Sequence, residues 1–138
     1  RSQARRILEG LDKFESIIDG RGEIIKIAQN VDVLEIVSKA GVKRAAHWHR
    51  RFGHICYLEY GEIEYFERDV DSNVRPIKLI IEPGEYFFTD KNKEHLMKFL
   101  VDSWMFCLSF GSRNKENYEE DTVRLDYDLE EIYNSWEE

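Results

Sequence analysis

Short runs rich in valine, isoleucine, tyrosine and phenylalanine divide most of this sequence, and this pattern limits the fold more than any other feature. Turn-forming residues such as Gly41, Gly53, Gly61 and the pair Pro83-Gly84 separate the runs. About ten short strands at this spacing are typical of an antiparallel sandwich or barrel. The predicted strands are 14–18, 22–28, 31–38, 43–49, 54–60, 62–69, 75–81, 85–89, 94–100 and 103–110.

The domain organisation follows from the length and from the absence of repeats. A chain of 138 residues with no internal repeat and no low-complexity linker predicts a single domain over 1–138. The core barrel is expected over about 14–111, and an acidic tail with a helix over 112–138. Residues 3–12 have the pattern of a short N-terminal helix.

The predicted C-terminal helix is amphipathic. Asp128 stands where an N-cap would lie, with Glu131 at the capping-box position. We expect the apolar face of this helix to pack on the barrel or on a second subunit, with a recognition helix for another partner as the alternative. That face consists of Leu129, Ile132, Tyr133 and Trp136.

The net charge of −8 argues against nucleic acid as a partner, because nucleic-acid binders usually carry a basic face. Ten acidic and three basic residues lie in 111–138, so nearly all of the excess belongs to the tail. No apolar run is long enough to cross a membrane, and no signal peptide is visible. Cys56 and Cys107 have no C-x-x-C spacing, which predicts a reduced thiol pair and a cytoplasmic protein.

Three of the four histidines lie within eight residues of one another, at His47, His49 and His54. His47 and His49 are two residues apart on a predicted strand, so their side chains share one face. A turn at Gly53 can bring His54 onto the adjacent strand. Three imidazoles placed this way can converge on one metal ion, although for an isolated H-x-H pair chance clustering would be the better explanation.

The wider spacing resembles the cupin superfamily, whose fold is the RmlC-like jelly roll. Its first motif, G-x5-H-x-H-x(3,4)-E-x6-G, fits Gly41, His47, His49 and Gly61, with His54 where the family usually has Glu. The second motif keeps its first glycine at Gly84 and its histidine at His95, while Asp90, Asn92 and Phe99 replace the family's Pro, Gly and Asn.

The cupin resemblance implies an all-β double-stranded β-helix and a divalent metal cofactor. All four histidines of the chain fall on the family's four ligand positions: His47, His49, His54 and His95. A site made of nitrogen ligands suits Fe, Ni, Zn or Cu better than Mg or Ca. Without a Glu ligand the site keeps a charge near +2, which favours an anionic, chelating substrate.

Three further motifs resemble cupins of nucleotide-sugar and surface-polysaccharide biosynthesis, especially the ketoisomerases of nucleotide-linked 4-keto-6-deoxyhexoses. They are D-x-R-G at Asp19, R-x-x-H-x-H at Arg44 and Y-x-x-D-x-V-R at Tyr118. This resemblance implies His47 and His49 as the catalytic pair if the enzyme needs no metal, and Arg44 as a substrate contact. The family has a Gln-like residue in place of His54 and no equivalent of His95, so the histidine set here departs from it.

Several strand residues have a second possible role. Cys56 shares the face of His54, and Tyr57 and Tyr86 lie on nearby strands, so these three are candidate substrate contacts, with core packing as the alternative. Trp104, Phe106, Leu108 and Phe110 alternate strictly and predict a core or subunit face. Together with the family's frequent pairing of barrels, this predicts a homodimer.

The sequence therefore favours a metal-binding cupin that isomerises or epimerises a sugar-derived carbonyl compound through an enediol-type intermediate. The substrate is expected to be a small molecule that could be nucleotide-linked. An Fe(II)-dependent dioxygenase with histidine ligands and a chelating substrate is one alternative. A non-catalytic module that binds a metal or ligand is the other.

Overall fold

The computed structural model describes residues 15–26, 31–110 and 115–137. All ten predicted strands lie at the expected places, with ends that differ by at most a few residues. Their bounds are β1 Glu15–Asp19, β2 Gly22–Lys26, β3 Val31–Ser38, β4 Lys43–His49, β5 His54–Tyr60, β6 Ile63–Asp69, β7 Ile77–Ile81, β8 Tyr86–Thr89, β9 Lys93–Phe99 and β10 Ser103–Phe110. The described part of the tail adds helix α2 (Lys115–Asp121), strand β11 (Thr122–Arg124) and helix α3 (Leu129–Ser135).

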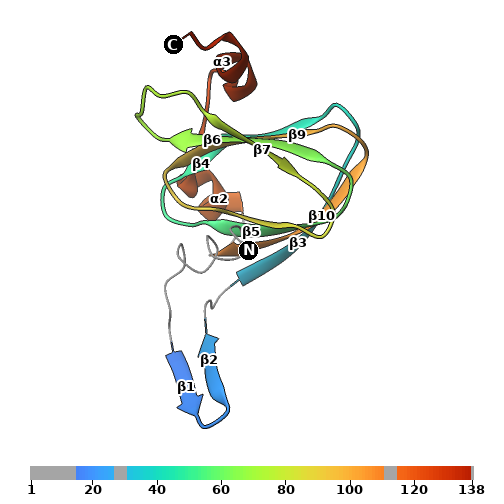
Figure 1. The fold of residues 1–138 in the computed structure, drawn as a ribbon. Helices are drawn as coiled ribbons and strands as arrows, with labels where there is room; N and C mark the ends of the chain where they lie inside the picture. The colour runs from blue at the N-terminus through green and yellow to red at the C-terminus, as the bar shows by residue number, and fades with distance from the viewer. Residues whose placement is uncertain (1–14, 27–30, 111–114, 138) are drawn as a thin grey trace.

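Two antiparallel sheets face each other and form the jelly roll (Figure 1). One sheet has the strand order β3-β10-β5-β8, and the other has the order β11-β4-β9-β6-β7. Neighbouring strands in each sheet are often far apart in the chain, which is the connectivity of a Greek-key barrel. The all-β jelly-roll fold is confirmed.

The core lies between the inner faces of the two sheets. Each strand alternates inward apolar residues with outward ones, so one face of each sheet becomes buried. Leu58, Tyr65, Phe99 and Met105 are completely shielded from solvent, and Phe87 is almost so. This packed half of the barrel supports the other half, where the inward positions are polar.

Strands β1 and β2 form a hairpin of their own and do not join the barrel sheets (Figure 1). At its turn, the Arg21 side chain donates hydrogen bonds to the Asp19 carboxylate, and the backbone N–H of Arg21 donates another. The barrel sheets therefore begin at Val31 rather than near residue 14. The helix predicted over 3–12 lies outside the described residues.

Helix α3 packs on the outer face of the five-stranded sheet. Asp128 caps α3 by accepting hydrogen bonds from the backbone N–H groups of Glu130 and Glu131, as the sequence predicts. The buried side chain of Leu129 packs with Phe66 and Leu96, and partly buried Ile132 and Tyr133 complete this cluster. Packing on the barrel is thus the role of this helix face. Among the described residues, no helix is long and apolar enough to cross a membrane.

Of the alternating residues of β10, Trp104, Phe106 and Leu108 point to the outer face of the four-stranded sheet, whereas Phe110 at the end of the strand lines a pocket. Their neighbours Met105 and Cys107 are buried on the inner face, whereas Leu108 is 39% exposed and Trp104 and Phe106 are half-buried. Of the two roles predicted for them, the position on the outer face excludes the barrel core. Pairing of two barrels through this face stays a prediction.

Candidate functional site

A bulge in β4 sets the position of the histidines. Ala45 and Ala46 both have left-handed backbone conformations, with φ of 72° and 56°, and the pairing of β4 with β9 shifts between Ala45 and His47. An extra residue in one strand of an antiparallel pair bends that strand and re-aims its side chains. After the bulge, His47 lies directly opposite His95 on β9.

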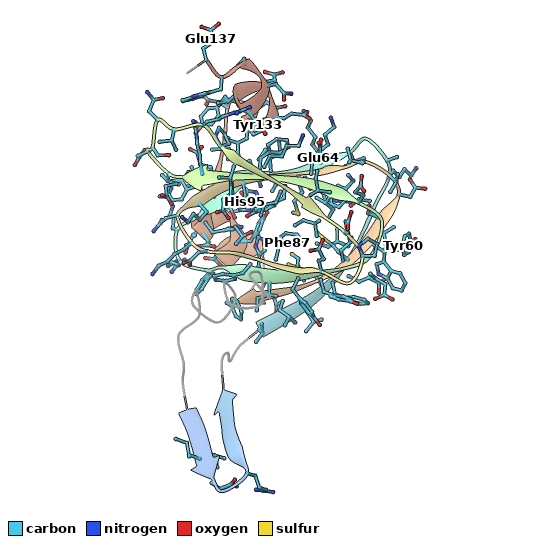
Figure 2. All side chains as sticks on the ribbon, viewed as in Figure 1. Tyr60, Glu64, Phe87, His95, Tyr133 and Glu137 are labelled. Carbon is cyan, nitrogen blue, oxygen red and sulfur yellow. The ribbon has the colours of Figure 1, made fainter. Side chains whose placement is uncertain are left out.

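The four histidines gather at one end of the barrel interior, and all are buried. The ring centroid of His47 lies 4.6 Å from that of His49 and 4.7 Å from that of His95. His49 and His95 are 5.6 Å apart. His54 comes from the opposite sheet, and its ring lies 5.3 Å from His95 and 5.9 Å from His49. The four imidazoles that the sequence motif groups together thus share one region of the barrel, and Figure 2 shows His95 inside it.

His95 is held as a neutral imidazole. Its Nδ1 atom lies 2.9 Å from the carbonyl oxygen of Lys93, so Nδ1 carries the proton and Nε2 carries the lone pair. The pKa of His95 is lowered from 6.5 to about 3, chiefly by complete burial and to a smaller extent by the neighbouring His49, while the bond to Lys93 opposes the shift. Nε2 is buried and has no hydrogen-bond partner, which suits a metal ligand or a substrate contact.

His49 is oriented by a carboxylate from the tail. The Nδ1 atom of His49 lies 3.1 Å from Oδ2 of Asp121, and both side chains are at least nine-tenths buried. Thr122 Oγ1 lies 3.3 Å from the same nitrogen. Strand β11 brings these residues into place because it pairs with β4, with Thr122 opposite His49. The carboxylate fixes the Nδ1–H tautomer of His49 and directs Nε2 into the barrel.

A pocket opens beside this pair. It is lined by residues from both sheets, from the loop between β4 and β5 and from α2, namely His49, Phe52, Gly53, His54, Ser109, Phe110, Tyr118 and Asp121. The ring of Tyr118 lies 6.1 Å from that of His49 and 6.3 Å from that of His47. Sequence reasoning did not assign Tyr118 or Asp121 to the site. The Y-x-x-D-x-V-R motif that contains both was the signal that could have found them.

A second polar group lies on the inner face near His95. Glu67 on β6 is buried directly opposite His95 in the sheet, and the Tyr65 hydroxyl donates a hydrogen bond to Glu67 Oε1 over 2.7 Å. The same hydroxyl lies 2.6 Å from Thr89 Oγ1. Sequence reasoning did not assign Glu67 or Thr89 to the site, because nothing in their local pattern separates them from ordinary strand positions.

The donor set fits a divalent metal ion. The side chains of His47, His49 and His95 each offer one nitrogen, and these three atoms all lie within 4.8 Å of one another. Hydrogen bonds at Nδ1 of His49 and of His95 leave Nε2 as the ligand atom of both. Neutral imidazoles with their other nitrogen anchored are the usual ligands of zinc and iron in proteins.

Solved structures share this architecture. The capsular polysaccharide assembling protein CapF from Staphylococcus aureus matches 84% of this chain with 19% identity and a TM-score of 0.65. A 3,4-ketoisomerase from Helicobacter canadensis matches 88% of this chain and 92% of its own, with 19% identity and a TM-score of 0.59. The dTDP-4-dehydrorhamnose 3,5-epimerase from Sulfolobus tokodaii matches 87% and 84%, with 16% identity and a TM-score of 0.60.

The chain has the cupin fold. It spans about a third of the CapF chain, since the match covers 35% of that protein. No family model matches the sequence, and no curated protein does. The cupin resemblance seen in the sequence is therefore shown at the level of the fold.

The cupin barrel places the remaining predicted residues as follows. His54 lies near His95 but forms a group of possible ligands with Cys56 and Cys107 rather than with the other three histidines. The Arg44 guanidinium donates hydrogen bonds to Ser38 Oγ and to the carbonyl oxygen of Val37, so it ties β4 to β3. The structure thus gives Arg44 a role in joining strands.

Tyr57 and Tyr86 lie on the outer face of the cupin barrel. Tyr57 alternates with the buried, inward residues Cys56 and Leu58, and its ring lies 4.7 Å from that of Tyr86, which is 51% exposed. Neither tyrosine lines the histidine pocket. Of the predicted substrate contacts, only Cys56 faces the barrel interior, where it lies behind His54.

Proposed function

We propose that this cupin is an isomerase or epimerase that moves a proton beside the carbonyl group of a sugar-derived compound, free or nucleotide-linked. The buried pair of His49 and Asp121 at the pocket carries this proposal. A carboxylate hydrogen-bonded to Nδ1 makes an imidazole a better proton acceptor at Nε2, because it stabilises the imidazolium that forms. The reaction class is also supported by the ketoisomerase and the epimerase that share this fold.

The proton transfer can be followed atom by atom. His49 Nε2 takes the proton from the carbon next to the carbonyl, and the electron pair of that C–H bond forms the enediol double bond while the carbonyl oxygen gains a proton. The Tyr118 ring lies 6.1 Å from that of His49 and lines the same pocket, so its hydroxyl is our candidate for the donor of that proton. If a proton then returns to the former carbonyl carbon while the hydroxyl group on the deprotonated carbon gives up its proton, the product is the isomeric ketone. If the proton instead returns to the opposite face of the deprotonated carbon while the enol oxygen gives back the proton that it gained, the product is the epimer.

A second function is favoured by the group formed by His47, His49 and His95. These residues would hold a divalent ion, and the ion would supply a Lewis acid or, if it were iron, a redox centre for chemistry with dioxygen. His49 cannot hold an ion and accept a proton at the same Nε2 atom. The Fe(II)-dependent dioxygenase is therefore an alternative to the base-catalysed isomerase, with Asp121 orienting a ligand in place of a base.

Deuterium exchange separates these functions. The full chain is incubated in D₂O with a panel of nucleotide-linked 4-keto-6-deoxyhexoses, and loss of the C–H signal beside the carbonyl is followed by NMR. We expect exchange without oxygen consumption, and a rate about 10²–10⁴ lower in His49→Ala, because the general base is removed. Asp121→Asn is expected to lower the rate as well.

Tyr60→Phe is the matched control for Tyr118→Phe, because Tyr60 is 49% exposed and its ring packs on Trp104 away from the pocket. We expect Tyr118→Phe to slow product formation and Tyr60→Phe to leave it unchanged. Oxygen consumption that depends on Fe(II), with no exchange, would instead establish the dioxygenase. Equal exchange rates in the wild type and His49→Ala would contradict the assignment of the base.

A further inference from the structure

Two cysteines and a histidine form a second group of donor atoms beside the histidine site. Cys56, Cys107 and His54 each offer one ligand atom, and these atoms all lie within 4.8 Å of one another. The two sulfur atoms are 3.0 Å apart. All three residues are buried, with 0%, 3% and 5% of their surface exposed.

The strand pairing of β5 with β10 produces this group. Cys107 lies directly opposite Cys56 in the antiparallel pair, so both thiols project from the same face of the four-stranded sheet. His54 is two residues before Cys56 on β5 and therefore shares that face. The donors thus come from regular, paired strands, which hold them in place before any ligand arrives.

The distances suit a tetrahedral ion. Metal–ligand bonds of about 2.3 Å to sulfur and about 2.0–2.1 Å to nitrogen separate tetrahedral ligands by roughly 3.3–3.8 Å. The three donor atoms lie within 4.8 Å of one another, so any pair would have to approach by at most about 1.5 Å. The two sulfur atoms, which are 3.0 Å apart, would have to move apart.

The charge balance also favours a thiophilic ion at this place. Around the cysteines the barrel interior is apolar, with Leu58, Phe87 and Met105 in the same cluster. A divalent ion is stable in such surroundings only if its charge is neutralised. Two thiolates and one neutral imidazole reduce the site charge to about zero, which the three-histidine group cannot do.

We propose that His54, Cys56 and Cys107 form a second metal site, specific for a soft divalent ion such as Zn²⁺ and separate from the group formed by His47, His49 and His95. The sequence motif places His54 with the other histidines, whereas the structure gives it two sulfur neighbours. This site does not depend on the proposed function, since no substrate takes part in it.

Titration of the freshly reduced full chain with Co²⁺ under argon tests the site, because thiolate ligation gives a charge-transfer absorption that imidazole ligation does not. We expect this absorption to saturate with one Co²⁺ and to be reversed by Zn²⁺. Cys56→Ala and Cys107→Ala should each abolish it. His47→Ala should retain it, since that histidine belongs to the other group.

Met105→Leu is the matched control, because Met105 is the inward neighbour of Cys107 on the same strand and its volume is nearly conserved. This variant should keep the absorption, and circular dichroism should show that every variant is folded. Absence of the absorption in wild-type protein whose two thiols still titrate after unfolding would overturn the site. An unchanged absorption and affinity in His54→Ala would overturn the assignment of the imidazole.

Discussion

The buried His95 imidazole makes the metal-free protein sensitive to acid. The pKa of His95 is about 3 in the folded chain, whereas a histidine in the unfolded chain has the ordinary value of 6.5. The unfolded chain therefore takes up the proton first when the pH falls. Unfolding is then favoured as pH decreases through the interval from 6.5 to about 3, and the stability is fully present above 6.5. A histidine that is stabilised by an acidic partner shows the opposite pH dependence, because its contribution to stability is lost as the pH rises.

The size of the effect follows from the two pKa values. Linkage gives a loss of about 3 kcal/mol in the free energy of unfolding between about pH 7 and about pH 4 from this group alone. That is a large part of the roughly 5–15 kcal/mol by which domains are usually stable. Because His95 is completely buried, solvent screening does not reduce this contribution.

Urea unfolding of chelator-treated protein at several pH values measures this loss in the free energy of unfolding, and the His95→Asn variant is the comparison. The Asn side-chain amide can replace the Nδ1–H donor to the Lys93 carbonyl, but it does not titrate. We expect the variant to lose about 3 kcal/mol less than the wild type between about pH 7 and about pH 4. Parallel pH profiles for the two proteins would refute the reasoning.

Three substitutions test the fold by thermal or urea unfolding. Ala45→Gly should raise the free energy of unfolding by about 1 kcal/mol, because glycine adopts the φ of 72° without strain; a less stable variant would contradict this. Gly61→Ala should lower the free energy of unfolding by at least about 2 kcal/mol, because a Cβ atom would clash with Ser103 and the φ angle of Gly61 is 111°. A variant as stable as the wild type would be inconsistent with this packing. Leu129→Ala should cost about 2–3 kcal/mol by leaving a cavity under α3, and no loss would show that the helix is not docked.

The strands could be predicted from the sequence because their signal is local. Alternating apolar residues and the turns between them lie within a few residues of one another, so the ten strands and the cap at Asp128 were found. Sheet membership is not local. The hairpin of β1 and β2 has ordinary strand patterns, and β11 is three residues in a polar tail that become a strand by pairing with β4.

The same distinction explains the site. The spacing of His47 and His49 on one strand predicts a shared face, and the cupin motif adds His95, which lies opposite His47. Asp121 could not be assigned from spacing, because it reaches His49 only through the return of the tail. The grouping of His54 with Cys107 likewise depends on which strands are neighbours in the sheet.

Deuterium incorporation by chelator-treated protein tests the central claim most directly. With a nucleotide-linked 4-keto-6-deoxyhexose in D₂O, the wild type should incorporate deuterium at the carbon beside the carbonyl group without consuming oxygen. The Asp121→Asn variant should incorporate it much more slowly. That result is expected because Asp121 holds the proton on Nδ1 of His49 and leaves Nε2 to act as the base. Equal incorporation by the two proteins, or incorporation only after a metal ion is restored, would contradict the account.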